Sequence, residues 1–474
     1  MKLKQNFCID TDAYKVTHWL LHKKLLQKMR SYGESRKGSH FDHTIFYGMQ
    51  IILIDSLEGE VVTKLGIEEA EDRSGAYFGT TKYFNKPMFN HIINKYGGML
   101  PIKIRAVKEG KKVPIDNVLF DIESLDDKCI PLVQHVETGL MHVWGGTTIA
   151  TNSHYIKSDI LKHLVKSGSP ELINFMCHDF GYRSTTCDQH AAIVGSAHLL
   201  SFNGSDTNIA DRAAKFYYGY KEDSILKSVL ASEHAIALMY GREEGEYEYV
   251  HACLDAAPPD KIVSIVIDTY DDINFIENVI TRPDIKEKIM NRPGKTVFRQ
   301  DSGDAIENTN RNLNTLANNF GFSHNKKHFK MLDPHIGLLQ GDGMTRQTIN
   351  ELYESIMVNK WSADNLVVGS GSGLLVKNFE RDTQRFAIKP CQNIINGEAI
   401  NVCKTPKGQP DKSSKAGELK LHETGGKFMT ISSNDTPKPQ FEGYTNALEV
   451  VFEHGEVKRR QTFNEIRDIA NGYL

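Results

Sequence analysis

A pattern that repeats after about residue 170 constrains the fold of this chain more than any other feature of its sequence. Short apolar runs are followed by a polar or glycine-rich turn, and then by a segment with the apolar spacing of an amphipathic helix. The last turns are roughly thirty to forty residues apart, which is the size of a βαβ unit. Such repeats predict a parallel sheet, either doubly wound or closed into an α/β barrel. The apolar runs lie within residues 173–183, 198–207, 261–272, 295–304, 335–343 and 365–373.

Chemically active side chains follow these apolar runs. In both α/β architectures ligands bind at the carboxyl ends of the parallel strands, so residues at that edge are candidates for a site. Aspartate, arginine and glycine dominate the turns, together with one phenylalanine. The sequence therefore predicts a site for a phosphorylated, Mg²⁺-bound substrate and an aromatic ring. The residues concerned are Phe180, Arg183, Asp206, Asp268, Arg299, Asp301 and Asp342, together with the glycine turns 340–343 and 369–373.

The turn RQDSGD, residues 299–304, has two interpretations. Its carboxylates could hold Mg²⁺ on a diphosphate while Arg299 binds the phosphate. It could equally be a capped helix start with a surface ion pair. The glycines of QGDG (340–343) and GSGSG (369–373) allow the backbone to approach a phosphate closely, although such turns are common without one.

Three further side chains have both a structural and a functional interpretation. Phe180 is either a core residue or a platform for a flat heterocycle. Asp206 is either a helix N-cap or a ligand for substrate. His234 follows Glu233 within SVLASEHAIALMYG, residues 228–241, and is either packed in the core or placed in a pocket. The short stretch alone does not decide between these two.

The two ends of the chain differ from its middle. Residues 101–124 alternate apolar and polar side chains between glycine and proline, which predicts antiparallel strands joined by turns. The segment after about residue 386 is again strand-like. We therefore expect a discontinuous domain from residues 1–150 and 386–474, and a barrel-like catalytic domain from residues 151–385.

Composition excludes several classes of function. The net charge of −3 indicates neither a nucleic-acid-binding nor a membrane-binding protein. The chain carries seven cysteines without a CxxC pair, which we interpret as reduced thiols. No apolar run has the length of a signal peptide or of a membrane span. A cytoplasmic enzyme that binds neither nucleic acid nor membrane is expected.

A series of short motifs extends along the chain. They are, in order, TDAYKVTH, FYGMQ, LPIKIRAVKEGKKVPIDNVLF, ATNS, HDFGYR, SAHLLSFNGSDT, SEHA, DTYD, RQDSGD, QGDG, GSGSGLL and FNEIR. Together they resemble the nicotinamide phosphoribosyltransferase family over essentially the whole length. The resemblance implies the irregular α/β barrel of the type II phosphoribosyltransferases beside an α+β domain that both chain ends build. It also implies a homodimer with active sites shared between the subunits.

The activity that the resemblance implies is phosphoribosyl transfer in NAD salvage. Nicotinamide and 5-phosphoribosyl 1-pyrophosphate would give nicotinamide mononucleotide and pyrophosphate, with Mg²⁺ as cofactor. Phe180 and Tyr14 of the partner subunit would enclose the pyridine ring, and Asp206 would accept its amide N–H. The phosphates, the ribose and the magnesium diphosphate would contact Arg183, Arg299, Asp301, Gly341, Asp342, Gly371 and Ser372, with Asp301 at the metal. Further cations near the phosphates would be Arg36, Arg381, Lys389 and Lys404.

His234 matches the histidine that ATP phosphorylates in this family, with Glu233 beside it in the ATP site. His234, Asp301 and Arg299 would then be the catalytic residues. The chain departs from the family pattern at Ser372, where glycine is expected, and at Gln300, where proline is usual; it also departs after Arg183. The alternatives are a nicotinate phosphoribosyltransferase of the same fold and a non-catalytic binding protein.

Overall fold

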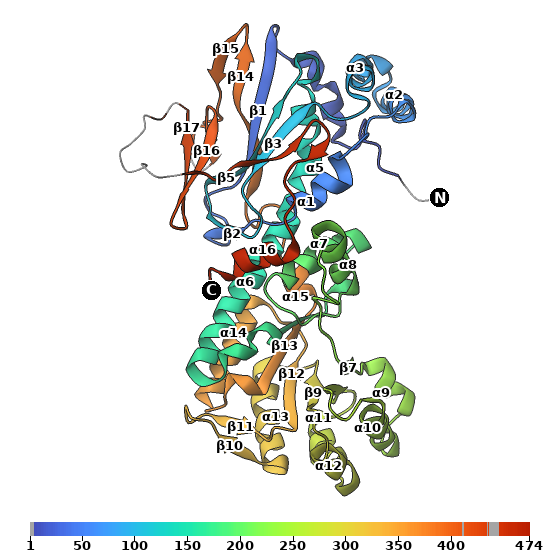
Figure 1. Cartoon of the computed structure of the whole chain (residues 1–474). Helices are drawn as coiled ribbons and strands as arrows, with labels where there is room; N and C mark the ends of the chain where they lie inside the picture. Colours follow the sequence, from blue (N-terminus) through green and yellow to red (C-terminus); the bar gives the residue numbers. More distant parts are fainter. Residues whose placement is uncertain (1–3, 410–411, 434, 436–444) are drawn as a thin grey trace. The chain divides into compact units, whose positions relative to one another are not determined.

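The structure, a computed structural model, describes residues 4–409, 412–433, 435 and 445–474. The chain divides into two compact units, each described separately below. The first comprises Met1–Thr151, Lys215–Tyr220 and Phe379–Tyr473, and the second comprises Asn152–Ala214, Lys221–Asn378 and Leu474. Two of the boundaries fall within α6 (Val143–Ser167) and α8 (Asn208–Tyr218). Figure 1 follows the chain through both units by colour.

An antiparallel sheet of seven strands is the centre of the first unit, in the order β15-β14-β1-β5-β3-β19-β20. Both ends of the chain contribute strands to it, as the sequence predicts. Buried and half-buried positions alternate along β3, the pattern of a sheet with one face against the core. Its strands are β1 (Leu26–Ser35), β3 (Ile102–Ala106), β5 (Asn117–Ser124), β14 (Phe386–Ile395), β15 (Glu398–Asn401), β19 (Glu449–Glu453) and β20 (Glu456–Val457).

Two small sheets and several helices complete the first unit. β3 and β5 confirm the antiparallel pair predicted within residues 101–124, whereas β4 pairs with β2 instead. The small sheets contain β2 (His43–Ile45) with β4 (Lys112–Pro114), and β16 (Leu419–Thr424) with β17 (Lys427–Ser432) and β18 (Thr445–Asn446). The helices are η1 (Ala13–Leu21), α1 (Met49–Ile52), η2 (Leu53–Leu57), α2 (Lys64–Phe78), η3 (Thr81–Tyr83), α3 (Lys86–Tyr96), η4 (Asp127–Cys129), α4 (Leu132–His135), α5 (Glu137–Met141) and α16 (Phe463–Asn471).

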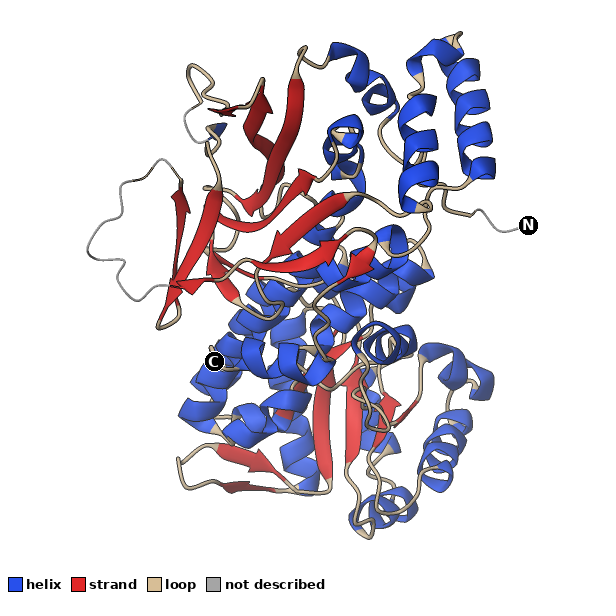
Figure 2. Cartoon of the chain, turned by 45° about the horizontal axis from the view of Figure 1, so that its top comes forward, coloured by secondary structure: helices blue, strands red, loops and turns tan. Residues whose placement is uncertain are grey.

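Six parallel strands form the sheet of the second unit, in the order β6-β13-β12-β9-β8-β7. They confirm the predicted parallel sheet. β8 and β12 are buried along their whole length, as expected for parallel strands that are covered on both faces. Figure 2 shows the strands side by side with helices flanking them. Their bounds are β6 (Cys177–Asp179), β7 (Leu230–Ala231), β8 (Val263–Val266), β9 (Thr296–Gln300), β12 (Ile336–Gln340) and β13 (Leu366–Ser370).

Isolated bridges connect the two edge strands of this sheet. Asp179, at the end of β6, pairs with Ser205, and Gly204 pairs with Lys227, shortly before β7 begins. The N–H of Asp179 donates to the carbonyl of Gly204 (3.1 Å), and the N–H of Ser205 donates to the carbonyl of Lys227 (3.2 Å). The strands therefore form an irregular barrel, whose closing side is held by single pairs.

The prediction of a strand within residues 198–207 is wrong. Helix α7 (Asp188–Leu199) reaches into this run, and only the bridges at Gly204 and Ser205 follow it. The backbone at Gly204 packs directly on the ring of His178, since a Cβ there would lie 2.5 Å from it. The apolar residues of this segment belong to the end of a buried helix. A short apolar sequence of this kind cannot be told from that of a buried strand.

Helices follow the strands of the second unit, as the sequence predicts. The side chain of Asp304 caps α13 by accepting from the N–H groups of Ile306 and Glu307. The unit also contains a hairpin of β10 (Phe322–His324) and β11 (Lys330–Leu332). Its other helices are η5 (Pro170–Phe175), η6 (Tyr182–Ser184), α9 (His234–Tyr240), α10 (Glu244–Ala256), α11 (Asp272–Asn274), η7 (Phe275–Val279), α12 (Pro283–Met290), α13 (Ala305–Phe320), α14 (Arg346–Val358), η8 (Ala363–Asn365) and α15 (Ser372–Leu375). Among the described residues of the whole chain, none of the helices combines the length and the apolar character that crossing a membrane requires.

Candidate active site

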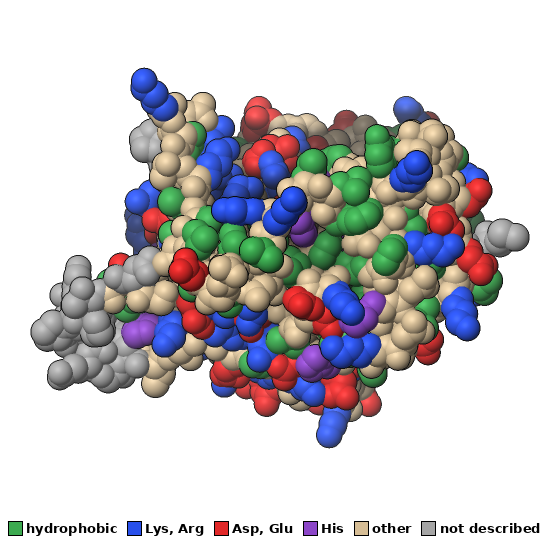
Figure 3. Space-filling view, turned by 90° about the horizontal axis from the view of Figure 1, so that it is seen from above, with side chains coloured by type: hydrophobic (Ala, Val, Ile, Leu, Met, Phe, Trp, Pro, Cys, Tyr) green, Lys and Arg blue, Asp and Glu red, His purple; other side chains and the backbone are tan. Residues whose placement is uncertain are grey.

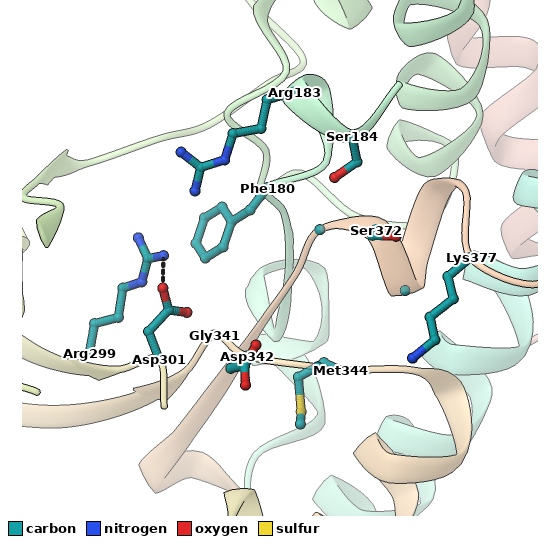
Figure 4. Close-up of a pocket in the computed structure, with 13 residues that line it drawn as sticks. Phe180, Arg183, Ser184, Arg299, Asp301, Gly341, Asp342, Met344, Ser372 and Lys377 are labelled. Carbon is teal, nitrogen blue, oxygen red and sulfur yellow. Dashed lines mark hydrogen bonds and ion pairs between the residues drawn. The ribbon is translucent and has the colours of Figure 1, made fainter. Parts of the chain in front are cut away.

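Two adjoining cavities of about 380 and about 400 Å³ open at the carboxyl ends of the parallel strands. Phe180, Arg183 and Arg299 line both of them. Figure 4 shows the first cavity, which residues at the ends of β6, β9, β12 and β13 line. The structure thus brings together most of the residues predicted for the second unit. The first cavity also contains Asp301, Gly341, Asp342, Gly371 and Ser372, and the second also contains Asp206 and Glu233.

Phe180 forms an aromatic wall between the cavities. Its N–H donates to the carbonyl of Ser370 (2.9 Å), which holds the turn after β6 against the end of β13. The guanidinium carbon of Arg299 lies 4.8 Å from the centre of the ring. Glycine is required at position 369, because a Cβ there would lie 2.1 Å from the ring. Phe180 is half-buried in a pocket wall and is not a core residue.

Arg299 and Asp301 face the first cavity as an ion pair. The Nη2 of Arg299 donates to Oδ2 of Asp301 over 2.9 Å, and both side chains are mostly buried. Gly341 lets the carboxylate approach the backbone, since a Cβ on Gly341 would lie 2.4 Å from Oδ1 of Asp301. The buried Nε of Arg299 has no hydrogen-bond partner among the described residues. A buried cationic donor without a partner is a favourable contact for an anionic ligand.

The turn after β13 forms the opposite wall. The hydroxyl of Ser370 donates to the carbonyl of Met344 (2.5 Å), and a Cβ on Gly373 would lie 2.2 Å from the same oxygen. These contacts hold the turn against the loop that follows β12. Ser372 is exposed at the start of α15, so its hydroxyl is available to a ligand. Lys377 adds a cation to the same cavity (Figure 4).

His234 lies at the surface of the second unit and is not a core histidine. It is the first residue of α9, and its side chain is 41% exposed. Its Nε2 lies 3.0 Å from Oδ1 of Asp268, a side chain that is only 5% exposed. Oδ2 of Asp268 accepts from the N–H of Asp301 and from the hydroxyl of Ser302, both over 2.6 Å. One buried carboxylate therefore connects the imidazole to the turn that carries Asp301.

Asp206, Arg183 and Glu233, which also line the second cavity, are exposed. The hydroxyl of Ser228 donates to Asp206, whose own N–H donates to the carbonyl of Asp179 (2.9 Å). Arg183 and Glu233 form a loose ion pair of 3.8 Å, with most of each side chain exposed. Exposed pairs of this kind contribute little to stability, so both side chains can turn toward a ligand.

Sequence reasoning missed Lys377 in the first cavity, and it missed the contacts of Asp268, which itself lines neither cavity. Asp268 ends an apolar run, which placed it at a strand end, but its contacts with His234 and Asp301 depend on folding. Lys377 follows the GSGSG motif by a few residues, and no spacing rule marks it as a ligand.

Asp179 lies beneath this site, and the ionisation of its carboxyl makes the stability of the folded chain depend on pH. It is fully buried, and burial raises the pKa of its carboxyl from 3.8 to about 6, even though the N–H of Gly181 donates to it over 2.7 Å. The folded chain therefore holds this proton more tightly than the unfolded chain does. Its ionisation consequently lowers the free energy of unfolding as the pH rises.

We expect the wild type to lose about 3 kcal/mol of stability relative to Asp179→Asn as the pH rises from about 4 to about 6. Asparagine is a neutral side chain of the same shape, and its oxygen can still accept from Gly181. Urea unfolding of both proteins across this range measures the difference. A difference that does not change with pH would contradict the assignment.

The remaining predicted residues belong to the first unit. Tyr14, on η1, has a side chain that is 60% exposed. The pKa of Lys389 on β14 is lowered by burial and by the nearby charges of Arg36, Lys404 and Arg381, against the opposing effect of Glu137. The structure thus gathers the four predicted cations within one unit. Figure 3 shows one face of the first unit, on which Lys and Arg side chains gather beside apolar ones.

Two family profiles match this sequence. The N-terminal domain of nicotinamide phosphoribosyltransferase matches residues 6–104, and the nicotinate phosphoribosyltransferase family matches residues 175–452. A nicotinamide phosphoribosyltransferase of Xanthomonas campestris pv. campestris is 34% identical over 99% of both chains. Another from Acinetobacter baylyi is 30% identical, over 78% of this chain and 76% of its own.

Solved structures share the fold. The nicotinate-nucleotide pyrophosphorylase of Pyrococcus furiosus has a TM-score of 0.61 and 14% identity, covering 98% of this chain and 94% of its own. Human nicotinic acid phosphoribosyltransferase has a TM-score of 0.59 and 12% identity, covering 97% and 93%. These similarities confirm the α/β fold of the type II phosphoribosyltransferases, together with the antiparallel sheet from both chain ends. The two profile matches, together with a relative that is 34% identical over nearly its full length, place this chain in the nicotinamide phosphoribosyltransferase family.

Proposed function

We propose that this protein transfers the phosphoribosyl group of 5-phosphoribosyl 1-pyrophosphate to nicotinamide in NAD salvage. The products are nicotinamide mononucleotide and pyrophosphate. The observation that carries the proposal is the pair of cavities joined at Phe180: one has an acceptor carboxylate, and the other has Arg299 with Asp301. A flat uncharged base fits the cavity that has the acceptor carboxylate, and an anionic sugar donor fits the cavity that has Arg299 and Asp301.

The base occupies the second cavity in this proposal. One face of the pyridine ring stacks on Phe180, and Asp206 accepts a hydrogen bond from the carboxamide. Tyr14 of a second subunit covers the other face, which makes a homodimer the functional unit. The large exposed fraction of Tyr14 supports such a role, because an exposed aromatic side chain is available to a partner. Arg36, Arg381, Lys389 and Lys404 supply cations to the phosphates across that dimer.

The phosphoribosyl donor occupies the first cavity. Gly341 and Asp342 contact its ribose, Gly371 and Ser372 contact its 5′-phosphate, and Arg183 and Lys377 add positive charge. The unpartnered Nε of Arg299 supports binding of the diphosphate. The carboxylates of Asp301 and Asp342 line the cavity, and such hard oxygen donors suit Mg²⁺. Mg²⁺ held there, with Asp301 as the main ligand, would neutralise charge on the departing diphosphate.

The transfer requires no strong general base. The pyridine nitrogen is a neutral nucleophile, and the barrier lies in loosening the bond between C1′ and the diphosphate oxygen. Arg299 stabilises the negative charge that grows on that oxygen. Stacking on Phe180 and the hydrogen bond to Asp206 orient the nitrogen toward C1′.

ATP accelerates the reaction in this proposal by phosphorylating His234. Asp268 accepts from Nε2, which leaves Nδ1 unprotonated and able to attack the γ-phosphorus of ATP. The γ-phosphoryl group moves to Nδ1, and ADP leaves with the electrons of the broken P–O bond. Glu233 lies beside this histidine in the ATP site. A phosphoryl group so close to the turn of Asp301 would raise the affinity for magnesium diphosphate.

Incubation with nicotinamide, phosphoribosyl pyrophosphate and Mg²⁺, with and without ATP, tests the function. We expect nicotinamide mononucleotide by mass spectrometry, and more of it with ATP. Competition between equal concentrations of nicotinamide and nicotinate tests the alternative. Preferential formation of the nicotinate nucleotide would replace the proposal, and no nucleotide with either base would indicate a binding protein.

Asp206 determines the choice of base in this proposal. Asp206→Ala should lower the ratio of kcat/KM for nicotinamide over nicotinate by about ten- to a hundredfold, because a carboxylate repels the acid and pairs with the amide. Steady-state kinetics with each base measure the ratio. Asp206→Asn is the matched comparison, since its amide can donate to nicotinate. A ratio that neither substitution changes would remove Asp206 from this role.

A further inference from the structure

Gln300 lies in a buried ladder of amide side chains beneath the first cavity. It is the last residue of β9, opposite Gln340 on β12, and both side chains are fully buried. The Nε2 of Gln300 donates to Oε1 of Gln340 and to the hydroxyl of Thr309, each over 2.6 Å. Its Oε1 accepts from Nδ2 of Asn312 over 2.8 Å. Both polar atoms of this buried amide are therefore paired.

The ladder extends into the loops on either side. Nε2 of Gln340 donates to the carbonyl of Asp342 over 3.4 Å, and Nδ2 of Asn312 also donates to Asp272 over 2.8 Å. The main chain adds a direct connection, because the N–H of Gly341 donates to the carbonyl of Gln300 over 2.9 Å. The loops that follow β8, β9 and β12 are thus tied to one buried network.

The residues next to the ladder line the cavity. Arg299 and Asp301 flank Gln300 in the sequence, and Gly341 and Asp342 follow Gln340 (Figure 4). Any change in the distance between Gln300 and Gln340 consequently moves the Arg299–Asp301 turn relative to the Gly341–Asp342 turn. A paired polar network in a dry interior resists such changes, because breaking it leaves groups without partners.

We propose that Gln300 is a positioning residue, which sets the spacing between the Arg299–Asp301 turn and the Gly341–Asp342 turn for the phosphoribosyl donor. This inference rests on the proposed function. A proline at this position could make none of these side-chain hydrogen bonds, so the ladder depends on the amide of Gln300. Gln300 contacts no substrate itself, and its effect falls on binding of the donor rather than on bond cleavage.

The test compares Gln300→Met, Gln340→Met and the double variant. Each single variant leaves a buried amide without its partner, so we expect KM for phosphoribosyl pyrophosphate to rise about tenfold, with kcat within about twofold. The double variant removes both partners and should raise KM no further. Amide exchange at residues 341–344 should quicken in the single variants, which is measurable without turnover. If one single variant does not fold, the other supplies the same comparison.

Asn365→Ala is the control for loss of a buried amide. Asn365 precedes β13, at the strand ends away from the cavities, where its side chain donates to Lys330 and accepts from Leu332. It should lower stability and leave KM unchanged. The inference is overturned if the glutamine variants keep the wild-type KM and loop exchange, or if Asn365→Ala raises KM as much. If the wild type makes no nucleotide, the proposed function fails, while the exchange data still test the ladder.

Discussion

Asp301→Asn should lower kcat/KM for phosphoribosyl pyrophosphate by about a thousandfold. The substitution keeps the size of the side chain and removes its charge. Arg299, 2.9 Å away, loses its partner, and the cavity loses the carboxylate proposed to hold Mg²⁺. Steady-state kinetics, with the donor varied at saturating nicotinamide and Mg²⁺, measure the effect. Raising the Mg²⁺ concentration should recover only a small part of the loss.

Asp304→Asn is the matched control. It makes the same chemical change three residues further on, where the side chain caps α13 and faces solvent. Asparagine caps a helix as well as aspartate does, so the fold and the activity should both be retained. Equal losses in the two variants would show that Asp301 acts through the fold of this turn rather than in the cavity.

His234→Gln should abolish the stimulation by ATP and leave the unstimulated rate near that of the wild type. A phosphorylated imidazole adds charge-assisted hydrogen bonds of about 1.5–3 kcal/mol each, so the lost stimulation should be about ten- to a hundredfold. Incubation with γ-labelled ATP should place acid-labile phosphate on the wild type only. The buried Asp268 would remain in place, because it still accepts from Asp301 and Ser302.

His251→Gln provides the comparison for this variant. His251 on α10 forms a similar pair with Asp284, with Nε2 and Oδ2 3.0 Å apart, and it lines neither cavity. This variant should incorporate phosphate and respond to ATP as the wild type does. Label on His234→Gln, or ATP stimulation that survives in it, would refute phosphorylation at this histidine.

The parallel strands of the second unit could be predicted because their signals are local. β8, β9, β12 and β13 are buried runs that end in a polar or glycine turn, and each turn is followed by a helix. Since the carboxyl ends of parallel strands share one edge, the sequence also placed Phe180, Arg299, Asp301 and Asp342 together. Local pattern and topology were sufficient for these residues.

Contacts between distant segments could not be predicted in the same way. β7 contains only two residues, and its pairing depends on β8 rather than on its own pattern. Asp268 meets His234 across 34 positions of the chain, and the apolar run before Asp268 gives no sign of that partner. The run ending near Asp206 predicts a strand that does not form, because a short apolar segment at the end of a buried helix has the same composition as a buried strand.

The uneven closure of the barrel has a consequence for ligand choice. β9 and β12 pair along their full length, whereas the side between β6 and β7 is joined by single bridges at Asp179–Ser205 and Gly204–Lys227. An interrupted ladder permits more local breathing than a continuous one, so this seam is the compliant side of the ring. Phe180 and Asp206 lie at this seam, whereas Arg299 and Asp301 lie at the end of β9, on the continuously paired side. Bulkier ring analogues should therefore be tolerated far better than altered sugar phosphates.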